Sequence, residues 1–372
     1  MKGNIIWCVI VCSIVFPFSL GAFDITVHPP KVSGTPEDGA VNAELETLVE
    51  SIEAEFVSEL EDADIQAVSL VKGFATANAF ASHAGSIRSV LDYGFMQVSL
   101  GASFGFQNPT SVPFNIGSLY EAAEETFDVL AGGGIQLGAQ VGINLSFLLP
   151  GLHGAIRLGK FAVSVPLAES VSLDHDLTMV GLVFSYPILK GVETAGTGWS
   201  GVSIGAGAIY ESLSSVYSRD FRYYYEPSSF SGDYVTIESL EARPSVHLEM
   251  ESSQVVVPLE VITGVKAVFM HVYGGLGMDL AFGSSELRLS ADPNFEVKGY
   301  IDATGEDLSS FVASEGSVEV KGSVTTAPVT LNPKLIMGTG WFLGPVVLET
   351  SLLLYFNEGS GFSGGITIAT MF

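Results

Sequence analysis

The chain contains very little cysteine. Its two cysteines, Cys8 and Cys12, both lie in an uncharged apolar run over residues 5–18, which follows a lysine and precedes small residues. This order is typical of a cleavable signal peptide, so we expect residues 1–21 to be removed; an uncleaved anchor and an acylated Cys12 are the alternatives. The mature chain then has no cysteine, which excludes disulfides, thiolate metal sites and cysteine nucleophiles.

Charged residues are also scarce, and most of them are acidic. They make up 15% of the chain, against about 25% in average proteins. Lys and Arg number 15 and Asp and Glu number 41, and the net charge of −26 argues against nucleic acid or anionic headgroups as partners. With 47% hydrophobic residues and a mean hydropathy of +0.42, the composition is too apolar for a secreted soluble domain.

Long apolar runs are missing after the signal peptide. No uninterrupted run approaches the ~18 residues that indicate a membrane helix. Apolar residues instead alternate with polar ones, most clearly in the segments 96–106 and 135–147. The polar positions of both segments carry no charge, whereas a soluble β-sandwich, the alternative, would normally expose Lys, Glu or Arg there. The pattern therefore favours strands that face lipid on one side.

The period-two pattern continues to the end of the chain and predicts a closed sheet. We expect an all-β transmembrane antiparallel β-barrel over residues 93–372, with 10 strands as a minimum and 12 or 14 possible. Long polar connections follow the odd strands and short turns follow the even ones, as in barrels with long outer loops and short periplasmic turns. Weaker strands follow the two segments above at 155–165, 177–187, 202–213, 255–264, 268–282, 329–341, 346–356 and 364–372.

The region between the signal peptide and the barrel, residues 22–92, has a different pattern. Apolar residues of the segment 45–60 recur at helical spacing among many glutamates. A second, more apolar and alanine-rich helix is predicted over 65–81, ending near Gly85. We expect this acidic helical segment either to lie in the periplasm or to fold into the barrel as a plug, because its apolar strip requires a cover.

The last strand carries a feature of its own. Ile366, Ile368 and Phe372 share one face, and the chain stops on the aromatic residue. Together with the export signal, this strand resembles the closing strand of bacterial outer-membrane β-barrels, in which the final aromatic marks the chain for barrel assembly. The resemblance implies a location in the outer membrane, contact with its lipids and recognition by the barrel-assembly machinery. Aromatic residues near predicted strand ends are expected at the membrane interfaces, namely Trp199, Tyr210, Trp341, Tyr355 and Phe356.

No pattern in the sequence indicates catalysis or a cofactor. The sharpest candidate is the run Asp174, His175 and Asp176, but adjacent residues of a strand point to opposite faces and form no dyad. The other histidines show no recognisable spacing to a serine nucleophile, and no convincing metal-ligand cluster, phosphate loop or dinucleotide fingerprint is found. We therefore expect a protein that is not an enzyme and that needs neither a metal nor a cofactor.

The leading functional prediction is a passive channel for small solutes or hydrophobic molecules. Neutral polar side chains would line its lumen, namely Gln97, Ser99, Gln136, Gln140 and Asn144. The order of parts is similar to that of long-chain fatty-acid transporters of the outer membrane, and Asn108 with Pro109 resembles the Asn-Pro of their N-terminal hatch. The alternative is a surface-exposed structural or adhesive barrel that presents the long loops 214–254 and 283–328, since the interiors of small barrels are filled by side chains.

Overall fold

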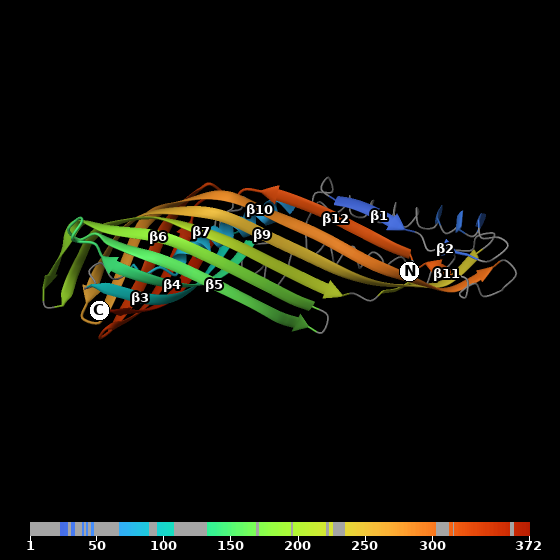
Figure 1. The fold of residues 1–372 in the computed structure, drawn as a ribbon. Coiled ribbons are helices and arrows are strands. Elements are labelled where there is room, and N and C mark those ends of the chain that lie inside the picture. Colours follow the sequence, from blue (N-terminus) through green and yellow to red (C-terminus); the bar gives the residue numbers. More distant parts are fainter. Residues whose placement is uncertain are drawn as a thin grey trace.

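The computed structural model is built mainly of antiparallel strands (Figure 1). The predicted signal peptide at 1–21 and most of the first predicted helix at 45–60 lie outside the described residues. The structure describes residues 23–28, 31–33, 39–40, 42–43, 46–47, 67–88, 95–107, 132–168, 171–194, 196–220, 223–225, 235–302, 312–314, 316–357 and 361–372.

Ten strands close a ring in these described ranges, because the two end strands of the series also pair with each other. Each predicted strand segment coincides largely with one of the ten, which confirms the predicted barrel fold. The ring order is β10 (Met270–Asp302), β13 (Leu331–Leu343), β14 (Val346–Tyr355), β15 (Gly361–Met371), β3 (Met96–Gln107), β4 (Gly132–Asn144), β5 (His153–Ala168), β6 (Val171–Thr194), β7 (Thr197–Asp220) and β9 (Val235–Ala267), which returns to β10.

The ring separates an apolar outer face from a polar inner face. On β4, for example, Ile135 is 61% exposed on the outside, whereas the next residue, Gln136, is fully buried inside. The outward apolar side chains form a belt around the barrel, and Leu100, Val261 and Leu276 are among its exposed members. An apolar belt of this kind is typical of a barrel surface that faces lipid. Ring closure also gives each wall strand two paired neighbours, as a strand in lipid requires.

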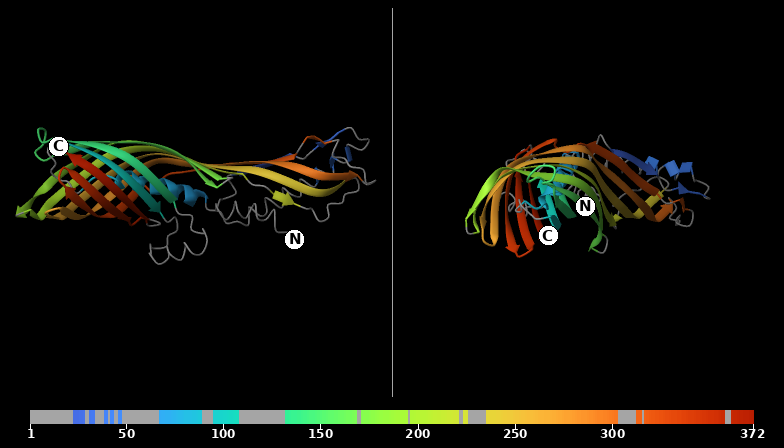
Figure 2. Two further views of the ribbon diagram at one scale, coloured as in Figure 1. Left: turned by 90° about the horizontal axis from the view of Figure 1, so that it is seen from below. Right: turned by 60° about the vertical axis from the view of Figure 1, so that its left-hand side comes forward.

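Four wall strands continue far beyond this belt. β6 and β7 have 24 residues each and β9 and β10 have 33 each, where about 9–11 residues suffice to cross a bilayer. β12 (Gly316–Thr326) adds an eleventh strand, which pairs with residues 285–295 of β10, and β1 (Phe23–His28) pairs with β12. Figures 1 and 2 show this sheet projecting from one end of the barrel. We call it the extension. It comprises β12, β1 and the parts of the four wall strands that lie on the far side of the belt residues Val180, Tyr210, Val255 and Phe282, namely 171–179, 211–220, 235–254 and 283–302.

Two sequence predictions differ from this part of the structure. Residues 214–254 and 283–328, predicted as outer loops that contain further β-like segments, consist largely of continuing strand. Beyond the belt the outward positions become polar or charged, as at Glu286 and Arg288, while inward residues such as Leu287 stay buried. The lipid-facing apolar pattern that marks the rest of these strands is therefore lost there. Residues 22–92, predicted to be helical, begin with strand β1. The remaining short strands are β2 (Lys31–Val32) and β11 (Val312–Ser314), which pair with each other, and β8 (Tyr223–Tyr225), which pairs with β9.

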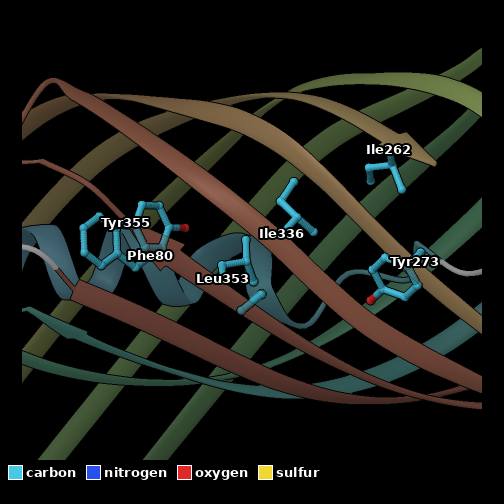
Figure 3. Packing of buried hydrophobic residues seen from close by; sticks show 7 residues of the cluster. Phe80, Ile262, Tyr273, Ile336, Leu353 and Tyr355 are labelled. Atoms are coloured by element: carbon cyan, nitrogen blue, oxygen red, sulfur yellow. The ribbon is translucent and has the colours of Figure 1, made fainter. Parts of the chain in front are cut away.

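Helix α3 (Ala67–Ala84) runs inside the ring and matches the helix predicted over 65–81 closely. Its side chains are small at most positions, and from Val71 onward almost all of them are buried. The aromatic ring of Phe80 stacks on that of Tyr355 with the centroids 3.6 Å apart. Both rings belong to a buried apolar cluster with wall residues Ile262, Tyr273, Ile336 and Leu353 (Figure 3).

Candidate functional site

The lumen of the barrel is occupied by α3, and glycines of the wall permit the close fit. A Cβ atom on Gly105 of β3 would overlap the carbonyl oxygen of Ala77, and one on Gly134 of β4 would overlap the side chain of Asn78. Gly365 of β15 lies equally close to the end of the helix. Because packed interiors leave little room for adjustment, these positions exclude larger residues while the helix is in place.

Wall side chains also donate hydrogen bonds to the backbone of residues 67–88, which we call the plug. Ser103 Oγ donates to the Ala81 carbonyl at 2.8 Å, and Ser351 Oγ donates to the Ala84 carbonyl at 2.6 Å. The last carbonyls of a helix have no partner within it, so these bonds satisfy buried groups that would otherwise stay unpaired. Further bonds run from Gln136 Nε2 to Asn78 O, from Gln254 Nε2 to Ala75 O and from Thr367 Oγ1 to Gly85 O, at 3.0, 2.9 and 3.0 Å.

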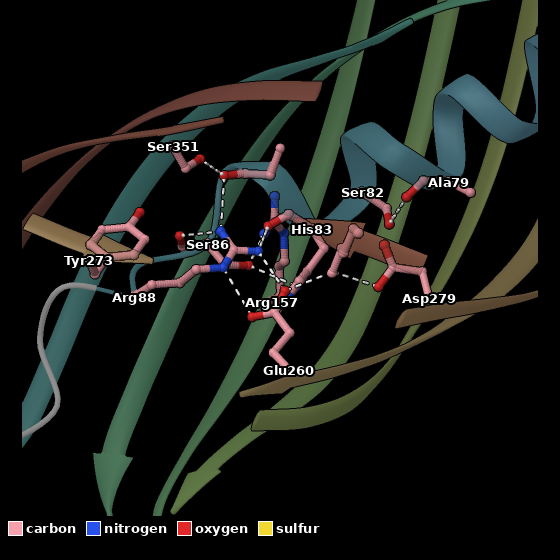
Figure 4. Close-up of polar contacts among 12 residues, drawn as sticks. Ala79, Ser82, His83, Ser86, Arg88, Arg157, Glu260, Tyr273, Asp279 and Ser351 are labelled. Carbon is pink, nitrogen blue, oxygen red and sulfur yellow. Dashed lines mark hydrogen bonds and ion pairs between the residues drawn. The ribbon is translucent and has the colours of Figure 1, made fainter. Parts of the chain in front are cut away.

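Arg88, at the C-terminal end of the plug, bonds to side chains of the wall (Figure 4). Its backbone N–H donates to Glu349 Oε1 at 2.8 Å, and its guanidinium donates to both carboxylate oxygens of Glu260 at 3.0 and 3.1 Å. The same guanidinium donates to the carbonyl of His83 at 2.9 Å, which ties it back to the helix. Tyr273 donates to Glu349 at 2.7 Å. A bidentate arginine–carboxylate pair of this kind combines a strong interaction with a fixed geometry.

Lys334 of β13 belongs to the same network and links Glu260 of β9 to Asp279 of β10. Its Nζ lies 2.6 Å from Asp279 Oδ1 and 2.7 Å from Glu260 Oε1, and the lysine and Asp279 side chains are fully buried. Tyr355 donates to the second oxygen of Asp279 at 2.8 Å, and His83 Nε2 lies 3.1 Å from Glu260 Oε1. Each carboxylate is therefore paired and hydrogen-bonded, which buried charges require.

Two further buried charges lie beside the plug, and neither forms a direct ion pair with another described residue. Arg157 is 2% exposed and donates to Ser86 Oγ, while Glu211 is 1% exposed and accepts hydrogen bonds from Gln136 and Gln254. A cavity of about 70 Å³ beside Ser86 is lined by polar side chains such as Gln97 and Gln140 together with apolar ones such as Val183. It has room for about two water molecules at ~30 Å³ each.

The structure places four of the five predicted lumen residues inside the barrel. Gln97, Ser99, Gln136 and Gln140 are at most 7% exposed and face the plug region instead of an open passage. Asn144 lies at the end of β4, where its side-chain oxygen accepts a hydrogen bond from the backbone N–H of Ser146 at 2.8 Å. It therefore belongs to the turn after β4.

The predicted interface aromatics divide between the two faces. Trp199, Tyr210 and Phe356 are exposed on the outside, and Trp341 is half-buried. The prediction is wrong for Tyr355, which is 1% exposed and stacks on Phe80 inside the barrel. Its position in the register of β14 points the side chain inward. The C-terminal side chains Ile366, Ile368 and Phe372 are 57%, 57% and 63% exposed.

The residues considered for chemistry do not converge. His175 Nδ1 hydrogen-bonds to Ser215 Oγ at 2.8 Å, while Asp174 and Asp176 are exposed. Among the described residues, no group of histidine, cysteine, aspartate and glutamate side chains is arranged to hold a metal ion. None of the helices in the described ranges combines the length and apolarity needed to cross a membrane.

Sequence reasoning missed the ion network, although its members carry a recognisable signal. Single charged residues interrupt strands whose other inward positions are uncharged, and an ionisable residue at membrane depth is usually paired or functional. Their partners could not be inferred, because they lie on strands far apart in the sequence. The missed residues are Arg88, Arg157, Glu211, Glu260, Asp279, Lys334 and Glu349.

We expect Lys334→Met to destabilise the barrel by about 3–5 kcal/mol, because it leaves Asp279 buried without its cation. Urea unfolding in detergent, followed by heat-dependent gel mobility, measures the change. The matched control is Arg288→Met on the extension, whose three glutamate partners are solvent-exposed to a considerable degree. It should leave the unfolding midpoint almost unchanged. Equal effects of both substitutions would contradict the assigned role of the buried network.

A closed antiparallel ring with an apolar belt and a plugged polar interior defines a transmembrane β-barrel. A family model described as Lsa36-like matches residues 23–372, so the chain belongs to the Lsa36-like family. No curated protein matches the chain.

Solved structures that resemble the chain are also barrels. The translocator domain of the autotransporter NalP from Neisseria meningitidis is 9% identical, with 76% of this chain and 90% of that chain covered and a TM-score of 0.30. The Ralstonia pickettii toluene transporter TbuX is 10% identical, with 83% and 94% covered and a TM-score of 0.24. The P. putida toluene transporter TodX is 8% identical, with 75% and 90% covered and a TM-score of 0.25.

Proposed function

We propose that this protein is an outer-membrane anchor that is closed to solutes and displays its extension outside the cell. The observation that carries the proposal is the plug, which fills the lumen and is bonded to the wall along its length. A barrel that served passive diffusion would lose its passage to such a helix. The predicted export signal, the apolar belt and the C-terminal strand support insertion in the outer membrane through the barrel-assembly machinery.

The outer face of the extension supports the display role. Just beyond the exposed Phe282 the outward side chains become charged, and Arg288 lies 2.8 Å from Glu286, 3.1 Å from Glu251 and 3.5 Å from Glu249. The hydrogen bonds to Glu286 and the surrounding carboxylates raise the pKa of the Arg288 guanidinium. A charged cluster of this kind belongs in water, so the belt ends below it and the extension projects from the membrane.

A passive channel for small solutes or hydrophobic molecules is the second candidate. It is favoured by the uncharged polar side chains on the inner wall, including Gln97, Ser99 and Gln140. Transport would require the plug to leave the lumen, and with it Arg88 would have to leave Glu260 and Glu349. The two candidates therefore differ in what the intact protein conducts.

Two measurements test the display role. Intact, folded protein in planar bilayers should show no stable openings, and protease added to intact cells should cut the extension while leaving a barrel fragment in the membrane. Stable openings of the intact protein would favour the passive channel. An extension that is cut only after the outer membrane is permeabilised would overturn the display proposal, because it would then face the periplasm.

A further inference from the structure

The two ends of the plug lie at opposite ends of the lumen. In the first half of α3, Phe74 packs against Leu177 and Leu213, which lie just beyond the belt residues Val180 and Tyr210 on β6 and β7. At the other end, Arg88 is bonded to Glu349, close to the short turn between β13 and β14. The 18 residues of α3 rise about 27 Å, which is close to the ~30 Å thickness of a bilayer core.

The chain after the plug begins its first wall strand at the short-turn end. The N–H of Phe95 donates to the carbonyl of Phe372 at 2.8 Å, and the N–H of Phe372 donates to the carbonyl of Met96 at 2.9 Å. This end also carries the turns between β6 and β7 and between β9 and β10. The plug thus joins the wall beside the C-terminus.

The chain before the plug lies at the other end, on the extension. β1 pairs with β12 from Phe23 opposite Gly322 to His28 opposite Ser317. Gly322 in turn pairs with Leu289 of β10, which is seven residues beyond the belt residue Phe282. Seven strand residues span roughly 23 Å, so β1 lies well outside the belt.

We infer that the chain crosses the membrane through its own lumen, so that the barrel displays its N-terminal segment on the same side as the extension. Residues 23–28 and 31–33 then lie outside the cell, α3 occupies the lumen, and the wall begins on the periplasmic side at Met96. The barrel thereby acts as the conduit and the holder of its own N-terminal segment, a role beyond that of an anchor for the extension. The inference rests on the proposed orientation of the extension, which the experiment below tests separately.

The composition of the plug fits passage through a narrow ring. A barrel of this strand number leaves an interior that side chains normally fill. The helix is accommodated because six of its 18 residues are alanine and because wall glycines such as Gly105 and Gly134 lie against it. The pairing of β1 with β12 then holds the segment that has passed through.

Single cysteines can locate the three regions, since the only native cysteines lie in the predicted signal peptide. Ser33→Cys reports on the N-terminal segment, Ser323→Cys on the extension and Thr194→Cys on the short-turn end, and all three positions are exposed. Full-length variants are labelled with a membrane-impermeant maleimide on intact cells and after permeabilisation of the outer membrane. The parent protein gives the background, and heat-dependent gel mobility confirms that each variant is folded.

We expect cysteines at 33 and 323 to be labelled on intact cells and the cysteine at 194 only after permeabilisation. Labelling at 323 but not at 33 on intact cells would overturn the inference and leave the display of the extension standing. Absence of labelling at 323 on intact cells would overturn the proposed function itself. The two failures are therefore distinguishable within one experiment.

Discussion

Replacing residues 23–92 with a short Gly-Ser linker should turn a silent barrel into a cation-selective pore. The intact protein keeps its lumen filled by the plug, whereas the shortened wall retains its ten paired strands. The wall then contributes Glu211, Glu260, Asp279 and Glu349 to the lumen, but only Arg157 and Lys334 as buried cations in the described strands. Four negative and two positive charges leave a net −2, which attracts cations.

The reversal potential in a salt gradient measures this selectivity. The matched variant carries Glu260→Gln and Glu349→Gln in the shortened chain, and it balances the two remaining carboxylates with two cations. It should conduct with little preference between cation and anion. A shortened barrel that is folded but silent would show that side chains close the lumen without the plug, and anion selectivity would contradict the charge assignment.

The sequence was most informative where one face of a strand meets lipid. The alternation around Ile135 and Gln136 places both residues on their observed faces without any knowledge of their neighbours. The same reasoning located α3 from its helical spacing and its alanines. It failed beyond the belt, because charged side chains such as Arg288 replace the lipid-facing apolar residues at the outward positions there, and so these stretches were predicted as outer loops.

The contacts inside the lumen could not be predicted from the sequence, for a different physical reason. Tyr355 is an aromatic residue at a strand end, as interface aromatics usually are. A position one residue along the strand faces the opposite way, and the register of Tyr355 turns it inward onto Phe80. Arg88 lies in a connection after a helix, and its partners Glu260 and Glu349 are 172 and 261 residues away. Only the closure of the ring brings such residues together, and periodicity carries no information about that.

Gly105→Val should destabilise the intact barrel by about 3 kcal/mol, although strand propensity alone favours valine by up to ~1 kcal/mol. The new side chain would overlap the carbonyl oxygen of Ala77 and approach the backbone N of Ala81. Both contacts are backbone atoms of a helix that is hydrogen-bonded to the opposite wall, so neither can move without breaking other bonds. The midpoint of urea unfolding in detergent measures the change.

Gly133→Val on the neighbouring strand is the matched control, because a Cβ at Gly133 meets nothing within 4 Å and the residue is exposed. Propensity acts there without a packing penalty, so the unfolding midpoint should stay level or rise slightly. The penalty at Gly105 should also vanish in the chain whose residues 23–92 are replaced, since the helix is then gone; a cycle of the two changes isolates their coupling. Persistence of the full penalty without the plug would mean that valine disturbs the wall itself, and the close fit of α3 would then no longer explain why this position is glycine.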